Sequence, residues 1–253
     1  MTLDPRYIAA HADHVPVYEG IHETHWYQDN ERDNWFRAMA DSDSRRQLEH
    51  LGWHSETAVS YRRNRHGFRG DNFTDHTDLI CLGCSFTFGF GIPEEHSWPS
   101  VLAKRLASAH VNLGVCGAAN DTMFRLARYW IPRLQPKTVA VLQTWPYRWE
   151  VCEYDGANPA SFLMHRVGRQ EAESVTDPML KKWILNDINH EISCERNQRA
   201  IQQICHEHDC RAVFVDVTQY LDLGPDDLAR DLAHPGVKWH AAMADTFYQL
   251  LKD

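Results

Sequence analysis

The sequence of 253 residues has no long hydrophobic run, no basic N-terminal stretch and no internal repeat. No apolar segment approaches the roughly 18 residues that a membrane-spanning helix needs, so we expect no membrane insertion. The first five residues, MTLDP, carry neither a basic start nor an apolar stretch, so no secretory signal is expected in the chain as given. The seven cysteines are an odd number, and without an export signal we expect reduced thiols and a cytoplasmic location.

Positive charge is scarce as well. Lys and Arg total 26 against 35 Asp and Glu, which gives a formal net charge of -9. This balance argues against nucleic acid or an anionic membrane as a partner held by overall charge. Hydrophobic residues make up 43% of the chain, which is enough for one sizeable core in a single α/β domain.

Lysine is absent from the first 78 residues, which nevertheless hold eight of the sixteen histidines. The apolar residues in this part are mostly aromatic and follow no regular spacing. We therefore expect residues 1–77 to form an irregular N-terminal extension, with one helix around residues 34–51, that packs on the core. Residues 78–253 are expected to form the main domain.

From residue 78 onward, short apolar runs alternate with segments of helical spacing. The predicted strands are residues 79–82, 111–115, 138–142 and 212–217. The predicted helices are residues 97–109, 121–134, 178–208 as one long or broken helix, and 238–251. This alternation predicts an α/β fold with βαβ units and a mostly parallel sheet that helices cover on both faces. Ligands of such folds bind beyond the carboxyl ends of the strands, so the loops at those ends are the places to search.

The loop after the first predicted strand is residues 83–91, GCSFTFGFG. It presents Ser85 at a strand end, between glycines that permit a tight turn, and the N–H groups of the next turn are suited to an oxyanion. An ordinary Gly/Ser turn is the alternative interpretation. The spacing excludes a phosphate loop, and it excludes a dinucleotide fingerprint because Glu94 stands where a third glycine is needed. It also excludes the nucleophile elbow, because Thr87 stands where that motif has glycine.

A second motif, residues 231–235 or DLAHP, comes just before the last predicted helix. Asp231 and His234 are three residues apart in one loop, so the carboxylate can orient the imidazole while the other ring nitrogen faces a nucleophile. Taken alone, the same sequence also suits a helix end at which His234 is a surface residue.

Together and in this order, the two motifs resemble the first and last blocks of the SGNH, or GDSL-type, hydrolase family, with Cys84 where aspartate is usual. Residues 112–117, NLGVCG, resemble its second block, and residues 64–70, NRHGFRG, are similar to a segment before the first block in some bacterial members. The resemblance spans about residues 78–253 and implies a three-layer α/β/α, flavodoxin-like domain.

The same resemblance implies an ester hydrolase in which Ser85 is the nucleophile, His234 is the general base and then the general acid, and Asp231 orients His234. It also implies that the backbone N–H groups of Ser85 and Gly117 bind the oxyanion. No metal or organic cofactor is expected.

The third block departs from the family pattern. Its usual Gly-x-Asn-Asp is replaced by residues 143–149, QTWPYRW, which contain no asparagine. Gln143, Thr144 or Asn120 could supply the missing oxyanion donor, and a weak or non-hydrolytic relative is the alternative. Asn120 also suits a helix N-cap. Thr144, Trp145 and Arg148 are the candidate substrate-binding residues, because aromatic faces suit sugar rings or flat acyl groups and a guanidinium suits an anion. Aromatic residues that merely cover the core are the alternative.

Two cysteine motifs remain. Cys81 and Cys84 form a Cys-x-x-Cys pair that we interpret as packed thiols, because Cys81 belongs to a buried strand. Residues 205–210, CHEHDC, are rich in metal-ligand types, but His206 and His208 diverge on a helix, so a solvated helix end is expected.

The sequence thus predicts a serine-dependent esterase that hydrolyses a small or carbohydrate-borne ester, such as an O-acetyl group, through an acyl-enzyme. Its expected partner is that ester substrate, with no nucleic acid, membrane or metal. Three alternatives stay open: an acyltransferase that uses the same triad, a binding protein that kept the fold without turnover, and a metal-binding module built on residues 205–210.

Overall fold

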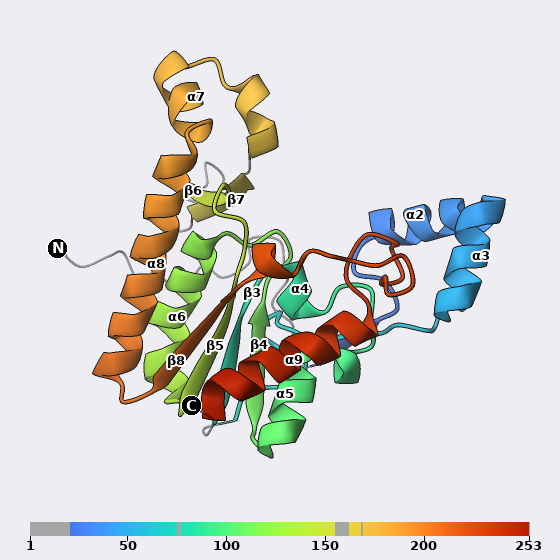
Figure 1. Ribbon diagram of the computed structural model, residues 1–253, viewed down its shortest axis with the longest axis horizontal. Helices are drawn as coiled ribbons and strands as arrows, with labels where there is room; N and C mark the ends of the chain where they lie inside the picture. Colours follow the sequence, from blue (N-terminus) through green and yellow to red (C-terminus); the bar gives the residue numbers. More distant parts are fainter. Residues whose placement is uncertain (1–20, 75–76, 155–161, 168, 253) are drawn as a thin grey trace.

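A four-stranded parallel sheet forms the centre of the computed structural model, which describes residues 21–74, 77–154, 162–167 and 169–252 (Figure 1). The strand order is β4-β3-β5-β8, and the strands are β3 (Leu79–Gly83), β4 (His110–Gly114), β5 (Thr138–Gln143) and β8 (Arg211–Asp216). The first strand of the domain therefore lies inside the sheet, the second on one side of it and the third and fourth on the other. This is the flavodoxin-like order, in which the crevice between the two halves opens beyond the carboxyl ends of the strands.

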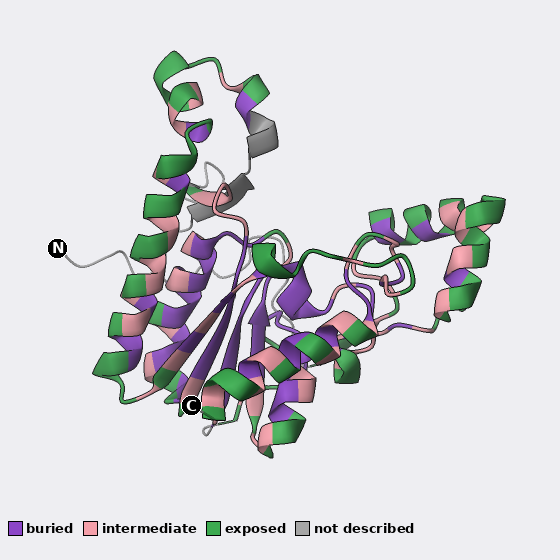
Figure 2. Cartoon of the chain, viewed as in Figure 1, coloured by how far each residue is buried: buried purple, intermediate pink, exposed green. Residues whose placement is uncertain are grey.

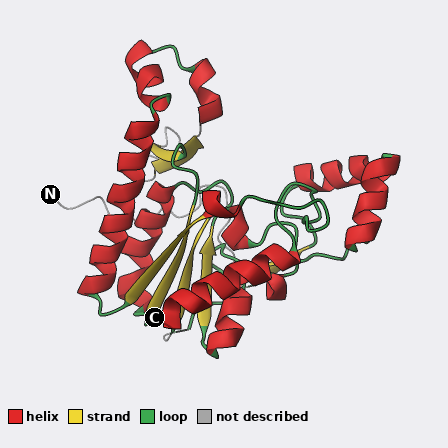
Figure 3. Ribbon diagram, viewed as in Figure 1, coloured by secondary structure: helices red, strands yellow, loops and turns green. Residues whose placement is uncertain are grey.

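Helices cover both faces of this sheet, as its uninterrupted apolar strands require (Figures 1 and 3). On one face lie α6 (Asn120–Leu134) and α8 (Asp187–Glu207), which pack against each other. On the other face lie α5 (Trp98–Leu106) and α9 (Val237–Lys252), joined by stacked rings of Trp98 and Phe247 with centroids 4.5 Å apart. The predicted three-layer α/β/α fold is confirmed.

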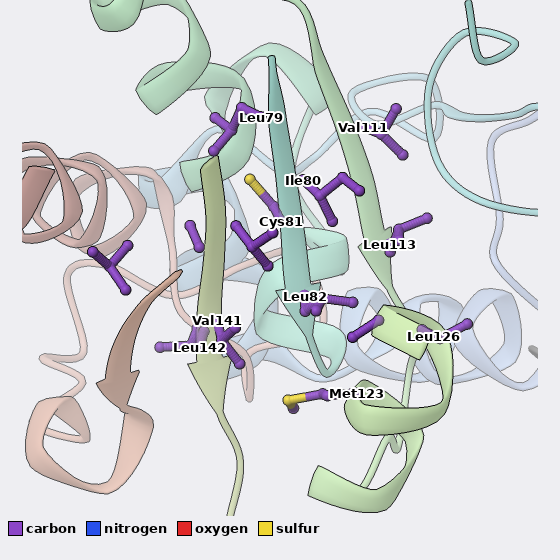
Figure 4. Close-up of a cluster of buried hydrophobic side chains, with 14 of the residues drawn as sticks. Leu79, Ile80, Cys81, Leu82, Val111, Leu113, Met123, Leu126, Val141 and Leu142 are labelled. Carbon is purple, nitrogen blue, oxygen red and sulfur yellow. The ribbon is translucent and has the colours of Figure 1, made fainter. Parts of the chain in front are cut away.

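The core lies between the sheet and the apolar faces of these helices, which are the buried faces in Figure 2. All five residues of β3 are buried. Figure 4 shows side chains of β3, β4 and β5 in one cluster with Met123 and Leu126 of α6. Met123 and Leu126 therefore lie on the face of α6 that packs on the sheet.

Other elements complete the description. The N-terminal segment contains β1 (His22–Thr24), α2 (Asp29–Ala40), α3 (Ser42–Leu51) and β2 (Tyr61–Arg63). The remaining elements are α4 (Ser85–Phe88), η1 (Glu94–His96), the antiparallel pair β6 (Trp149–Tyr154) and β7 (Phe162–Val167), η2 (Arg169–Ser174), α7 (Pro178–Ile184) and η3 (Val217–Tyr220). None of the helices in the described ranges is long and apolar enough to span a bilayer.

The N-terminal segment is more regular than the sequence predicted. One helix was expected over residues 34–51, and that prediction is wrong because the chain breaks at Asp41, whose backbone is extended. The Asp41 carboxylate accepts a hydrogen bond from the Ser44 N–H at 2.9 Å and so starts a second helix. The β1–β2 pair and the β6–β7 pair were not predicted either.

Candidate active site

Ser85 is the first residue of α4, directly beyond the carboxyl end of β3. Two glycines let this short helix lie on the strand ends. A Cβ on Gly83 would stand 1.9 Å from Thr87 Oγ1, and a Cβ on Gly114 would stand 2.3 Å from the Phe88 nitrogen. The glycines of the first and second sequence blocks are therefore needed for the close approach that places Ser85.

A connected chain of hydrogen-bonding groups joins Ser85 to the loop before α9. His234 Nε2 lies 2.9 Å from Ser85 Oγ, and His234 Nδ1 lies 2.5 Å from Asp231 Oδ2. The other carboxylate oxygen of Asp231 accepts from the backbone N–H groups of Ala233 at 3.1 Å and His234 at 2.9 Å. The structure thus brings together the three residues that the sequence motifs suggested, although 149 positions separate Ser85 from His234.

Two aromatic rings pack against the His234 imidazole. Its centroid lies 4.8 Å from Phe90 and 5.6 Å from Phe86, both in the segment that follows β3. Phe86 in turn meets Trp145 and Trp239 edge-on, at 5.5 Å and 5.4 Å. This packing restricts rotation of the imidazole and holds the ring that contacts Ser85.

Asp231 is held in its charged form. Burial raises the pKa of this carboxyl group, but the hydrogen bond and charge of His234 and the two backbone N–H donors outweigh it, so the pKa lies below its ordinary value. An ionised Asp231 accepts a hydrogen bond from the N–H at Nδ1 of His234, which leaves Nε2 free to act as a base.

This pKa shift predicts a stability effect. The folded pKa of Asp231 is lower than the unfolded one, so the stability it contributes is present above the unfolded value and is lost as the pH falls through the folded value. The unfolding free energy of the native chain should therefore fall more steeply than that of Asp231→Asn below about pH 4. Urea unfolding between neutral pH and pH 3 measures this difference, and parallel curves for the two proteins would contradict it.

Two backbone N–H groups are the predicted oxyanion donors. Ser85 is at the first position of α4, where an N–H group has no partner within the helix. Gly117 follows β4 with a φ of +76°, a conformation that glycine adopts without strain. Among the turn, loop and cap hydrogen bonds of the described residues, none has the N–H of Ser85 or of Gly117 as its donor. Oxyanion binding by these two groups stays a prediction.

Asn120 occupies a different environment from the one the sequence suggested. Its Nδ2 donates to the Thr144 carbonyl at 3.1 Å and contacts Cys194 Sγ at 3.4 Å, and its Oδ1 accepts from the Thr144 N–H at 3.1 Å. The N-cap of α6 is Ala119, so the N-cap interpretation of Asn120 is wrong. Both amide protons have partners, so donation from Asn120 to an oxyanion stays a prediction that requires the weak thiol contact to be exchanged.

Cys194 was not found by sequence reasoning, because it lies in α8, 74 positions after Asn120. Its thiol also accepts from Gln143 Nε2 at 3.3 Å. This contact engages one of the two amide protons of Gln143, so its role as an oxyanion donor stays a prediction. Burial, together with the charges of Asp216 and Asp121, raises the pKa of Cys194 to about 11. The thiol is therefore protonated at neutral pH and is not a competing nucleophile.

The loop after β5 carries the predicted substrate-binding residues. Thr144 is buried, and its Oγ1 accepts from Arg148 Nη1 at 3.1 Å. The Arg148 guanidinium lies 4.4 Å from the centroid of the Trp145 ring. Among the described side chains, no carboxylate forms an ion pair with Arg148. The three residues thus form one unit that reaches Phe86 through the Trp145 ring.

A buried ion pair anchors the end of this loop. The carboxylate of Glu150, at the start of β6, accepts from Arg125 Nη2 and from Thr122 Oγ1, each at 2.7 Å. The Glu150 N–H donates to Asp121 at 3.0 Å. These contacts fix the loop to α6. They could not be predicted from the sequence, because the polar residues that form them are isolated and lie on separate elements.

The cysteine motifs lie outside this site. Cys81 and Cys84 are buried free thiols, as expected, and burial raises the pKa of Cys81. Cys205 and Cys210 lie where α8 ends and β8 begins. This is the amino end of the strand, whereas Ser85 follows the carboxyl end of β3. The described part of the chain contains no group of three or more His, Cys, Asp and Glu side chains that could hold a metal ion.

No protein-family model matches the chain, and the curated proteins contain no match either. Solved structures similar to it include a member of the lipolytic G-D-S-L family from Veillonella parvula, at 12% identity and a TM-score of 0.34, covering 69% of this chain and 98% of that one. A second is the psychrotrophic esterase EstA from Pseudoalteromonas sp., at 13% identity and a TM-score of 0.36, covering 71% of this chain and 97% of that one. A third is the acetylxylan esterase Axe2 from Geobacillus stearothermophilus, at 17% identity and a TM-score of 0.34, covering 68% of this chain and 93% of that one. The first of these structures carries the G-D-S-L family name, and the other two are named as esterases. At such identities and TM-scores, the roles of residues rest on the geometry of this chain alone.

Proposed function

We propose that this protein is a serine-dependent esterase that hydrolyses a small or carbohydrate-borne ester, such as an O-acetyl ester, through an acyl-enzyme. The observation that carries the proposal is the connected chain of Asp231, His234 and Ser85 at the carboxyl end of β3. A hydroxyl within bonding reach of an imidazole, which a carboxylate orients in turn, is the arrangement that activates serine for acyl transfer.

The proposed reaction has two halves. In the first, His234 Nε2 takes the proton of the Ser85 hydroxyl while Oγ attacks the carbonyl carbon of the ester. The tetrahedral intermediate collapses, the C–O bond to the alcohol breaks, and the alcohol leaves with the proton from His234. In the second half, His234 takes a proton from water, the resulting hydroxide attacks the acyl carbon, and Ser85 leaves and regains its proton.

The negative oxygen of each tetrahedral intermediate would accept from the N–H groups of Ser85 and Gly117. One such donor contributes about 3–4 kcal/mol to transition-state stabilisation. Asn120 is proposed as a further donor, reached when its Nδ2 leaves the thiol of Cys194. The hydrogen bonds of Asn120 to the Thr144 peptide keep the amide beside this site before any substrate binds.

The substrate is proposed to bind against Trp145, Arg148 and Thr144. Trp145 offers a flat face beside Phe86, which suits a sugar ring or a planar acyl group. Arg148 has three guanidinium nitrogens, and only Nη1 is engaged by Thr144 among the described residues. Its remaining donors suit an anionic group of the substrate, such as a carboxylate.

Replacement of Arg148 by alanine tests this role. The variant should lose about 10- to 100-fold in kcat/KM for an ester that carries a carboxylate, because a hydrogen bond to a charged group contributes about 1.5–3 kcal/mol. The loss for a neutral ester of the same size should be much smaller. Arg133→Ala is the matched control, since Arg133 also stacks on an aromatic ring, that of Tyr129, but on the exposed side of α6. Equal losses for both esters would make Arg148 structural.

Product analysis tests the proposed reaction itself. The purified chain should release acetate from 4-nitrophenyl acetate, and added monosaccharides should not divert most of the acetyl group. Transfer to the sugar in excess of hydrolysis would identify an acyltransferase that uses the same triad. Neither acetate nor acetylated sugar above the uncatalysed rate would favour a binding protein without turnover.

A further inference from the structure

Arg230, the residue before Asp231, is fully enclosed by the N-terminal segment. The whole residue is only 1% exposed, and its guanidinium donates to the Glu31 carboxylate at 2.7 Å. It also donates to the carbonyls of His25 at 2.6 Å and Glu56 at 3.3 Å. The loop that carries Asp231 and His234 is therefore held by residues that lie about 200 positions earlier in the sequence.

The ion pair between Arg230 and Glu31 is part of a closed ring of four hydrogen bonds. The Arg230 N–H donates to the Gly91 carbonyl at 2.9 Å, and the Gly91 N–H donates to the Tyr61 hydroxyl at 2.9 Å. The Tyr61 hydroxyl donates to Glu31 at 2.8 Å, and Glu31 completes the ring through its ion pair with Arg230. Gly91 belongs to the segment that follows Ser85, so the ring joins both loops of the catalytic site.

The two loops also touch directly. Gly91 has a φ of +75°, and a Cβ at this position would stand 2.9 Å from Ala229 Cβ and 3.1 Å from the Arg230 nitrogen. A second buried guanidinium, that of Arg69, donates to the carbonyls of Phe88 at 3.0 Å and Ile92 at 2.7 Å on either side of this contact. The segment after Ser85 is thus fixed by the N-terminal part of the chain as well.

The hydrogen bond between Ser85 and His234 spans these two loops. A displacement of about 1 Å between reacting groups can cost about 10²-fold in rate, so whatever fixes the spacing of the loops affects catalysis. Glu31 is the group where the ring converges, because one of its carboxylate oxygens accepts from both Arg230 and Tyr61. Its other oxygen accepts from the Tyr27 N–H at 2.6 Å.

We propose that Glu31 is a positioning residue for catalysis, which acts through Arg230 and Tyr61 to hold the His234 loop at bonding distance from Ser85. The N-terminal segment is then part of the catalytic apparatus rather than a covering for the core. This inference rests on the proposed function.

The test is Glu31→Gln in the full chain, with kcat and KM measured on an activated acetyl ester. Glutamine keeps the size and an acceptor oxygen but removes the charge that Arg230 requires. We expect kcat to fall about 10- to 100-fold and KM to change less than about threefold, because loop spacing affects the reacting groups and not the substrate-binding loop. Tyr61→Phe should lower kcat in the same way, and it provides the test if Glu31→Gln does not fold.

Glu150→Gln is the matched control. Glu150 is a buried carboxylate that also accepts from one arginine and one hydroxyl, at 2.7 Å each, but it anchors the loop after β5. Glu150→Gln should destabilise the fold about as much as Glu31→Gln does, which thermal unfolding measures. Its kinetic effect should fall mainly on KM. A kcat loss as large as that of Glu31→Gln would reduce Glu31 to a general stabilising role and overturn the proposal.

The same substitution in a chain that already carries His234→Ala separates a positioning effect of Glu31 from an effect on stability. If Glu31 acts through His234, Glu31→Gln should change the residual rate of His234→Ala by less than about twofold, because groups that act as a unit are not additive. The same loss in both backgrounds, or an unchanged kcat in a folded Glu31→Gln chain, would contradict the proposal. If Ser85→Ala also retains full activity, the proposed function fails instead, so the two failures are distinguishable.

Discussion

Ser85→Ala is expected to lower kcat for an activated acetyl ester by on the order of 10⁶-fold, because loss of the nucleophile removes the covalent path and leaves only the oxyanion donors and binding. The hydroxyl replaced is the one that lies 2.9 Å from His234 Nε2. A fluorophosphonate probe should add covalently to the native chain and should not add to the variant. Intact-protein mass spectrometry and initial rates measure the two effects.

Ser97→Ala is the control for this substitution. Ser97 is also a buried serine, but its hydroxyl donates to the Glu94 carbonyl at the start of α5 and contacts no triad residue. The control should react with the probe as the native chain does. Undiminished labelling or turnover in Ser85→Ala would exclude Ser85 as the nucleophile.

His234→Ala should lower kcat by at least the factor of about 10²–10⁴ that general acid–base catalysis usually contributes, and by up to about 10⁶-fold because the triad acts as a unit. The ring accepts the Ser85 proton in the proposed mechanism, and no other described imidazole forms a hydrogen bond with Ser85 Oγ. Steady-state rates on the same ester measure the loss. Because the rings of Phe86 and Phe90 pack against the imidazole, the variant loses these contacts. Thermal unfolding must therefore show that the variant is folded at the assay temperature.

His208→Ala provides the comparison, since His208 is an exposed residue at the C-cap of α8, just before the amino end of β8. Its rate should equal that of the native chain. Equal rates for His234→Ala and the native chain would remove His234 from the mechanism.

The parts of the structure that the sequence predicted are those encoded by local patterns. The four core strands are short apolar runs, and parallel topology follows from their alternation with helices. Ser85 was found because it directly follows such a strand, and Asp231 with His234 because a spacing of three lets them bond within one loop. The rule that sites form beyond the strand ends indicated which loops to search, and the resemblance to one hydrolase family then joined the two distant motifs.

What the sequence did not predict depends on single contacts between distant residues. The pairing of Glu31 with Arg230 joins positions 199 apart, and isolated polar residues leave no periodic trace. The same holds for Asn120 with Cys194 and for Arg125 with Glu150. The break between α2 and α3 was missed for another reason, since the N-cap role of Asp41 within residues 34–51 was not recognised.

The most direct measurement of the central claim is the mass of the peptide that contains Ser85 after acid quench of the chain during turnover of an activated ester. We predict that this peptide gains the mass of one acyl group, that fragmentation assigns it to Ser85, and that Ser85→Ala shows no gain. An acyl group assigned to Cys84 instead, or rapid turnover without any modified peptide, would contradict the account.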